Sequence, residues 1–276
     1  SDFFTKIYYN IFGDTMENIT DAYMERRKIY NIALKTAELL IKNGSEISRA
    51  NDTVKRILAS HGYFDIPLFL SPTVIIIGDN SDNSSFYLVK NIETRGNNIG
   101  RVNMLNAFSR EFCAKNIAID EAMQKLEEIE KKSEYSFMMI LVMACIGCAV
   151  FTLMLGGSFS DFACSIFTSA CGFVVNEYIL KLSKTPFLGN FVSSLVATLA
   201  AVLLVKLNLG HNLNMIVVGS ILPLVPGVAF TSGIRDFLSG DLIAGTARSF
   251  EAIFVAVAIA FGVGSVLMLV SLMGWI

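Results

Sequence analysis

The second half of the chain carries almost no charge, and this feature limits the possible folds most. Residues 136–276 hold 10 of the 46 Asp, Glu, Lys and Arg residues. A helix needs about 20 mostly apolar residues to cross the hydrocarbon core of a membrane. Five runs in this half are long and apolar enough: 136–155, 161–180, 188–207, 213–232 and 251–273. The sequence therefore predicts an α-helical membrane protein with five transmembrane helices.

The overall composition excludes several other classes. Hydrophobic residues make up 53% of the chain, too many for an ordinary soluble domain. A net charge of −2 gives no argument for a nucleic-acid partner. Cys145 and Cys148 form a C-x-x-C inside an apolar run without a nearby histidine, and His61 and His211 lie far apart in the sequence. We expect packing cysteines, no metal site and no cofactor.

The first half has the composition of a folded domain outside the membrane. Residues 1–24 are assigned to an N-terminal extension and residues 25–135 to a cytoplasmic α+β domain. Residues 136–276 form the five-span transmembrane domain with a broken fourth span. Within the α+β domain, apolar spacing predicts helices at about 25–43, 46–60, 100–113 and 120–132. Residues 65–78 and 86–91 are rich in β-branched and aromatic residues and predict strands, separated by a polar turn at 79–85.

No helix breaker separates the last charged helix from the first apolar run. We therefore expect one rod from Asp120 to Leu155, about 54 Å long at 1.5 Å per residue. Such a rod would couple the α+β domain rigidly to the membrane domain.

The positions of basic residues predict the orientation. Lys131 and Lys132, Lys181 and Lys184, and Arg235 and Arg248 all fall on one side of the predicted spans, whereas Lys206 lies alone on the other. Cytoplasmic flanks are richer in Lys and Arg. The N-terminal domain is therefore predicted to be cytoplasmic and the C-terminus to lie outside.

The stretch ILPLVPGVAFTSGIRDFLSGD, residues 221–241, breaks the fourth apolar run. Pro226 cannot donate a helical hydrogen bond, and Gly227 disfavours helix on entropic grounds. Non-helical backbone inside a membrane survives only where protein buries it or where it lines water. A helix restarting there, capped by Thr231 or Ser232, would carry Arg235 and Asp236, and Ser239 would cap another helix that begins at Asp241.

This break has two interpretations. As a discontinuous transporter helix, it would offer free N–H groups and Arg235 to an anionic substrate. Residues predicted to bind substrate or to gate are Pro223, Pro226, Gly227, Thr231, Arg235, Asp236 and Asp241. Alternatively, the prolines only kink the span, and Arg235 and Asp236 form a structural ion pair at the cytoplasmic interface.

Three further carboxylates lie in or beside the predicted spans. Asp161, near the start of the second span, either stabilises a helix N-terminus or takes part in proton or substrate handling. Glu177 either pairs with Lys181 or titrates during transport, and Glu251 either pairs with Arg248 or titrates in a cavity. All three are candidate proton or coupling groups.

Several segments of the chain resemble the threonine/serine exporter family of bacteria and fungi. The similar segments are LLIKNGSEISRANDTVKRI (39–57), SPT (71–73), LNAFSR (105–110), GGSFSD (156–161) and the block at 221–241. The resemblance covers residues 29–270. It places functional residues at Pro223, Pro226, Gly227, Arg235, Asp236, Gly240 and Asp241. In the α+β domain it places a motif at Gly44, Glu46, Arg49, Thr53 and Arg110.

The resemblance also implies a function. Family members export small amino acids or organic acids, and their long forms have about ten spans. A five-span chain is similar to the larger subunit of the split, two-protein form that has been linked to dicarboxylate (succinate) export. It implies a multi-pass protein of the bacterial inner membrane, a short four- or five-span partner subunit, a homo- or hetero-oligomer, and a small acid or amino acid as substrate.

Two other functions stay open at this point. The chain could be a membrane-tethered, hydrolase-like enzyme, although Ser48, Ser71 and His61 are candidates by residue type alone and enzymatic activity is not expected. It could also be a receptor or scaffold that binds a small acid without moving it.

Overall fold

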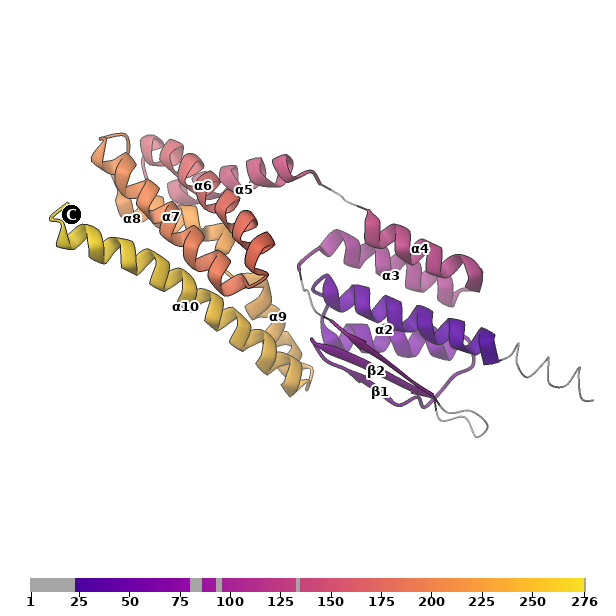
Figure 1. The fold of residues 1–276 in the computed structure, drawn as a ribbon. Coiled ribbons are helices and arrows are strands. Elements are labelled where there is room, and N and C mark those ends of the chain that lie inside the picture. The colour runs from indigo at the N-terminus through magenta and orange to yellow at the C-terminus, as the bar shows by residue number, and fades with distance from the viewer. Residues whose placement is uncertain (1–22, 80–85, 93–95, 133–134, 276) are drawn as a thin grey trace, which may run out of the picture. The chain divides into compact units, whose positions relative to one another are not determined.

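The computed structural model describes residues 23–79, 86–92, 96–132 and 135–275 (Figure 1). The chain forms two compact units. The first, the α+β unit, comprises the residues up to Lys132 together with Arg235–Gly245, which we call the elbow. The second, the membrane unit, comprises Ser133–Ile234 and Thr246–Ile276. Most of the predicted N-terminal extension, residues 1–22, lies outside the described residues, and residues 23 and 24 are helical.

The α+β unit has the elements that the sequence predicts. A helix covers residues 23–42, and three strands form an antiparallel sheet in the order β1-β2-β3. The other elements are α2 (Ile47–Ser60), β1 (Leu68–Leu70), β2 (Val74–Asp79), β3 (Phe86–Asn91), α3 (Ile99–Cys113) and α4 (Ile119–Lys131). The predicted turn at 79–85 falls largely outside the described residues.

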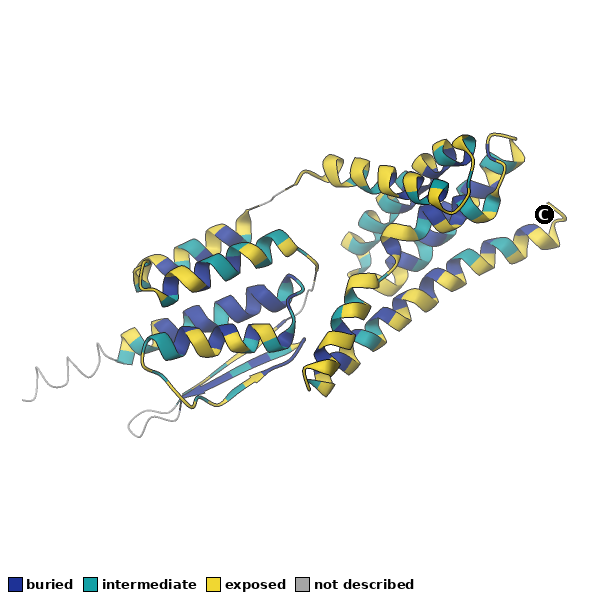
Figure 2. Ribbon diagram, turned by 180° about the vertical axis from the view of Figure 1, so that it is seen from behind, coloured by how far each residue is buried: buried dark blue, intermediate teal, exposed yellow. Residues whose placement is uncertain are grey.

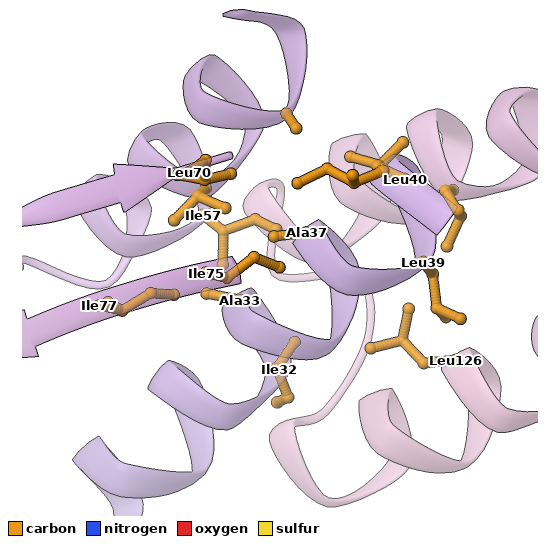
Figure 3. Packing of buried hydrophobic residues seen from close by; sticks show 14 of the residues in the cluster. Ile32, Ala33, Ala37, Leu39, Leu40, Ile57, Leu70, Ile75, Ile77 and Leu126 are labelled. Carbon is orange, nitrogen blue, oxygen red and sulfur yellow. The ribbon is translucent and has the colours of Figure 1, made fainter. Parts of the chain in front are cut away.

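A continuous apolar core holds this unit together (Figure 3). Ile75 pairs with Leu70 and lies two residues from Ile77, so the two isoleucines face the same side of the sheet. That side packs against buried residues of the helix at 23–42 and of α2, including Ala33 and Ile57. The core thus comes from the β-branched residues of the predicted strands and the apolar spacing of the predicted helices.

The predicted rod from Asp120 to Leu155 is wrong. The helix α4 ends at Lys131, and Lys132 leaves helical geometry with ψ of 114°. The next helix begins only at Phe137, because Ser136 is extended and its hydroxyl accepts a hydrogen bond from the N–H of Met139. Ser136 is a favourable N-cap residue. Its capping bond starts a new helix where the sequence offers no proline or glycine as a break.

The membrane unit contains four helices long and apolar enough to span a membrane, and one bent pair. The long helices are α5 (Phe137–Met154), α6 (Phe159–Ser183), α7 (Pro186–Lys206) and α10 (Leu242–Leu272). The bent pair consists of α8 (Leu213–Ile221) with the 3-10 turn η1 (Leu222–Leu224), followed by α9 (Gly227–Leu238). All five predicted spans have a counterpart here, and α10 begins nine residues earlier than its predicted span.

Small and hydroxyl-bearing side chains are buried between the helices of the membrane unit, beside three small apolar clusters. The hydroxyls of Thr152 and Ser165 lie 2.7 Å apart between α5 and α6, and those of Thr168 and Ser220 join α6 to α8. A Cβ atom added at Gly219 would overlap Thr152, so α8 packs closely against α5. Close packing of small residues is typical of helix interfaces in membranes.

Candidate functional site

The break in the fourth span lies between η1 and α9. The helices on its two sides are bent by 56°. The carbonyl of Leu222 accepts from Val225 N–H, and the carbonyl of Val225 accepts from Gly227 N–H in a tight turn. Pro226 has no N–H to donate, and its own carbonyl accepts from Phe230 N–H at the start of α9. The predicted interruption at Pro226 and Gly227 is therefore present.

The break is open on this chain. Pro223, Val225 and Gly227 are exposed. Apart from its chain neighbours and the nearby backbone of its own helix, no atom of the described residues would lie within 4 Å of a Cβ added at Gly227. Pro226 is half-buried. Thr231 is exposed inside α9, and its hydroxyl donates to the carbonyls of Gly227 and Val228. Thr231 therefore does not cap a new helix, because α9 already begins at Gly227, directly after the proline.

Within the elbow, the residues between the end of α9 and the start of α10 form a tight turn. Gly240 has φ of +84°, which favours glycine, and its N–H bonds to Phe237 O while Asp241 N–H bonds to Asp236 O. This pair of bonds satisfies carbonyls at the end of α9. Asp241, not Ser239, caps the next helix: its Oδ1 accepts from Ala244 N–H at 2.9 Å. A short carboxylate at the N-cap position, directly before the first helical residue, is a strong cap.

Arg235 and Asp236 meet the first turn of α2 within the α+β unit. Arg235 Nη1 lies 2.5 Å from Glu46 Oε1, and Arg49 Nε lies 3.4 Å from Glu46 Oε2. Asp236 is fully buried, and its Oδ1 accepts from the N–H of Ile47, the first residue of α2, at 3.2 Å. We call the contacts of Arg235 and Asp236 with Glu46 and Ile47 the clasp.

The clasp brings together motif residues that are far apart in the sequence. Glu46 stands at the N-cap position of α2 but makes no capping bond with its side chain, because its carboxylate is turned to the two arginines. Asp236 supplies the acceptor from 189 residues away. The sequence predicts four of the residues near the clasp as separate motif or site residues: Glu46, Arg49, Arg235 and Asp236. It does not predict that they lie next to one another.

The remaining motif residues of the α+β unit lie near α2 or on α3. Gly44 has φ of +91° after the helix at 23–42, and a Cβ there would meet Asn97 Oδ1 at 3.0 Å. Thr53 is buried and its hydroxyl donates to Arg49 O. Arg110 is exposed in the last turn of α3. Gly44 and Thr53 thus shape the turn before α2 and its first turns.

Asp161 is buried at the start of α6. Its Oδ2 accepts from the N–H and the hydroxyl of Ser158, both at 2.8 Å, and its Oδ1 accepts from His211 N–H at 2.7 Å and from Asn212 N–H at 3.0 Å. Ser158 Oγ in turn accepts from Asp161 N–H. This capping box ties α6 to the loop before α8, and the S-x-x-D pattern at 158–161 could have signalled it.

The other two candidate coupling carboxylates are half-buried. Glu177 lies in the second half of α6, and Glu251 lies ten residues into α10. Neither shares the capping arrangement of Asp161.

The candidate hydrolase residues have local structural contacts. Ser71 Oγ accepts from Val74 N–H at 3.0 Å within the turn between β1 and β2. The His61 ring stacks on Phe112 at 4.7 Å, and its Nδ1 lies 3.0 Å from Ser60 Oγ. Within residues 23–79, 86–92, 96–132 and 135–275, no three His, Cys, Asp or Glu side chains are grouped as ligands of a metal ion would be.

Four apolar helices long enough to cross a membrane, together with a proline-broken bent pair, are the features of a multi-pass membrane protein. The chain belongs to the threonine/serine exporter family (ThrE), whose sequence profile matches residues 31–270. Transport is the activity that the family's name gives.

Three curated relatives show how the family is divided. A probable threonine/serine exporter of Mycobacterium tuberculosis is 20% identical over 87% of this chain and 46% of its own length. The threonine/serine exporter of Corynebacterium glutamicum is 23% identical over 86% of this chain and 50% of its own. The probable succinate transporter subunit YjjP of Klebsiella aerogenes is 20% identical over 91% of this chain and 97% of its own.

The chain thus spans about half the length of the two exporters and nearly all of the transporter subunit. No solved structure matches the chain.

Proposed function

We propose that this chain is one subunit of a secondary transporter that exports small amino acids or small organic acids across a bacterial inner membrane. The observation that carries the proposal is the open break at Pro223–Gly227. Irregular backbone at membrane depth has to be buried in protein or to line water. Because Pro223, Val225 and Gly227 are exposed on this chain, another protein surface or an aqueous path has to cover them.

The missing cover is a second membrane subunit in this proposal. The two exporters are about twice as long as the region that matches this chain, and the relative of matching length is named as a subunit. A short four- or five-span protein would supply what the second half of the long exporters supplies. The lipid-facing sides of α5 and α10, which carry exposed Met143 and Phe254, are available to it.

The bent pair counts as one span rather than as a re-entrant loop. Arg235 contacts Glu46 within the α+β unit, so both residues lie on the same side of the membrane. An even number of crossings has to separate Lys132 from Arg235. The helices α5, α6 and α7 make three, and α8 with α9 makes the fourth. Together with α10 this gives five spans, and the basic flanks favour a cytoplasmic α+β unit and an external C-terminus.

At the break, the start of α9 presents the positive end of a helix dipole, which suits a carboxylate of the substrate. Pro223, Pro226, Gly227 and Thr231 are the residues we assign to the substrate path or its gate. Glu177 and Glu251 are candidate coupling groups because they are half-buried carboxylates in spanning helices. The protein moves its substrate without converting it, so no catalytic residue is assigned.

The test is transport by the whole complex. A tag on this chain would be used to purify it with its partner from gently solubilised membranes. The complex would be reconstituted into vesicles loaded with labelled threonine, serine or succinate. We expect gradient-dependent release of at least one of the three, and purification of a small multi-span protein with the chain.

A matched pair of glycines sharpens this test. Gly227 at the break and Gly147 in α5 are both exposed, and a Cβ at either would meet nothing within 4 Å. Both positions therefore admit a Cβ atom without a clash, and both are exposed, so leucine is introduced at comparable places. Gly227→Leu should abolish most of the release, whereas Gly147→Leu should leave it unchanged. If both variants release the compound equally, the break does not lie on the substrate path. If the wild-type complex releases none of the three compounds, the transport proposal is overturned for them.

A further inference from the structure

The helix α9 belongs to both units of the protein. Its residues Gly227–Ile234 lie in the membrane unit, and its last turn, Arg235–Leu238, lies in the α+β unit. The helix is continuous across this boundary. Anything that holds the last turn of α9 therefore also holds the segment that starts at the break.

The elbow, which includes the last turn of α9 and the first turn of α10, packs into the α+β unit. Asp236 is fully buried and bonds to Ile47 N–H, and Ala244 is fully buried in the same apolar core as the helices and the sheet. Gly245 packs against the Phe237 ring, which would lie 2.7 Å from an added Cβ. The contacts of Asp236 and Ala244 hold the elbow on the rest of the α+β unit, and the Gly245–Phe237 contact closes the elbow on itself.

The contacts of the clasp differ in strength. The Arg235 side chain is 60% exposed, and an ion pair as exposed as this one contributes little to stability. A buried carboxylate, in contrast, is costly unless it is hydrogen-bonded, and at the first turn of a helix it also gains from the dipole. Asp236 is thus the anchor of the clasp, and the Arg235–Glu46 pair orients it.

Arg235 is also far from the break along the helix. It follows Gly227 by eight residues, which is about 12 Å of α-helix. Its recorded partner is a carboxylate of the chain itself.

We propose that Asp236 and Arg235 are positioning residues that fix the inner end of the broken span to the first turn of α2, so that the α+β unit sets how the segment after the break is held. This inference rests on the proposed transport function and adds to it a part for the α+β unit. The helix α9 runs without interruption from the membrane unit into the clasp, whereas α4 ends at Lys131 and α5 begins only at Phe137.

The first experiment measures the clasp directly. Amide hydrogen exchange of the first turn of α2 would be followed in the whole complex in detergent or nanodiscs. In Asp236→Ala, exchange at Ile47 should rise about tenfold or more, as expected for the loss of a hydrogen bond to a charged group. Asp236→Asn keeps an acceptor oxygen and should recover part of the protection. Lys55→Glu, an exposed change further along α2, serves as the control and should leave Ile47 unchanged.

The second experiment separates positioning from substrate binding. Arg235→Gln, Glu46→Gln and the double variant would be compared for the KM and the maximal rate of transport. Positioning predicts that each single variant lowers the maximal rate with little change in KM, and that the double variant loses no more than the worse single one. Arg235→Lys keeps the charge and should restore most of the rate.

Several outcomes would overturn the inference. Unchanged exchange at Ile47 in Asp236→Ala would show that the clasp does not form. A raised KM in Arg235→Gln, with Glu46→Gln like the wild type, would assign Arg235 to the substrate instead. If the wild-type complex transports none of the tested compounds, the proposed function fails, yet the exchange measurements still decide whether the clasp exists.

Discussion

The two units of this protein have opposite interiors. The α+β unit buries Ile, Leu and Phe side chains in one large apolar cluster. The membrane unit has only small apolar clusters, buries many hydroxyls, small residues and Asp161 beside them, and exposes most of its large apolar side chains. Figure 2 shows how much of each unit is exposed. Water drives the first arrangement by the hydrophobic effect. Lipid gives no such drive, so close packing and hydrogen bonds between helices have to hold the second. The same substitution should therefore have different effects in the two units.

The largest expected effect follows from removing a large apolar side chain from each unit. Phe108 is 1% exposed in the α+β unit and stacks on Phe112, whereas Phe261 in α10 is 63% exposed. Phe108→Ala should lower the free energy of unfolding by about 3–5 kcal/mol. Phe261→Ala should change it little. Thermal and denaturant unfolding of the whole protein in detergent would compare the two, and similar losses would contradict the contrast between the interiors.

The buried carboxylate of the membrane unit gives the next effect. Asp161→Asn replaces a charged acceptor that takes hydrogen bonds from Ser158, His211 and Asn212, and should cost about 1.5–3 kcal/mol of stability. Glu177→Gln on the same helix is the matched control and should stay within about 0.5 kcal/mol of the wild type. If Asp161→Asn unfolds like the wild type but no longer transports, Asp161 is a coupling group rather than a structural cap.

Close packing inside the membrane unit can be tested on one helix. A Cβ at Gly262 in α10 would overlap Ser194 and the carbonyl of Phe191, whereas a Cβ at Gly264 would meet nothing within 4 Å. Gly262→Ala should destabilise the protein by about 1–3 kcal/mol. Gly264→Ala should cause no loss, because alanine favours the helix over glycine. The readout is again the unfolding midpoint in detergent, and a reversed order would remove this contact from the account.

The smallest effect is electrostatic and lies in the α+β unit. Glu130 accepts from Lys35 at 2.7 Å and from Lys42 at 3.2 Å, and these hydrogen bonds, that of Lys35 first, hold the pKa of Glu130 below its usual value of 4.5. A lowered pKa in the folded state means that the ionised form favours folding. The contribution is fully present above 4.5 and is lost as the pH falls through the lowered pKa.

Glu130→Gln removes a partly exposed ion pair and should therefore lower the free energy of unfolding by about 0.2–1 kcal/mol at neutral pH. The difference from the wild type should disappear in acid. Unfolding curves of both proteins over a pH series would measure it. A difference that persists at low pH would mean that packing, and not charge, makes Glu130 favourable.

Local patterns predicted most of the elements. The strands are readable from their β-branched and aromatic residues, and the helices of the α+β unit from their apolar spacing, because both signals depend on neighbours in the sequence. The helix caps expected at Thr231 or Ser232 and at Ser239 were wrong. The five spans were predictable from hydropathy, and the break from Pro226 and Gly227. The interruption at Ser136 was missed because a serine before an apolar run is a weaker signal than a proline. The Asp236–Ile47 contact was missed because it joins residues 189 positions apart, and no local pattern encodes such a pairing.

The elbow makes the α+β unit discontinuous in the sequence, which has a consequence for its biosynthesis. Residues up to Lys132 leave the ribosome first, but Asp236 and Ala244 follow only after four helical segments have been made. At usual rates of synthesis the delay is on the order of 5–20 s. During that time the N–H of Ile47 at the start of α2 lacks its bond to Asp236, and the apolar core lacks Ala244. The unit is finished only when the nascent chain has passed Gly245. The α+β unit can therefore complete its fold only after the helices α5 to α9 have been synthesised.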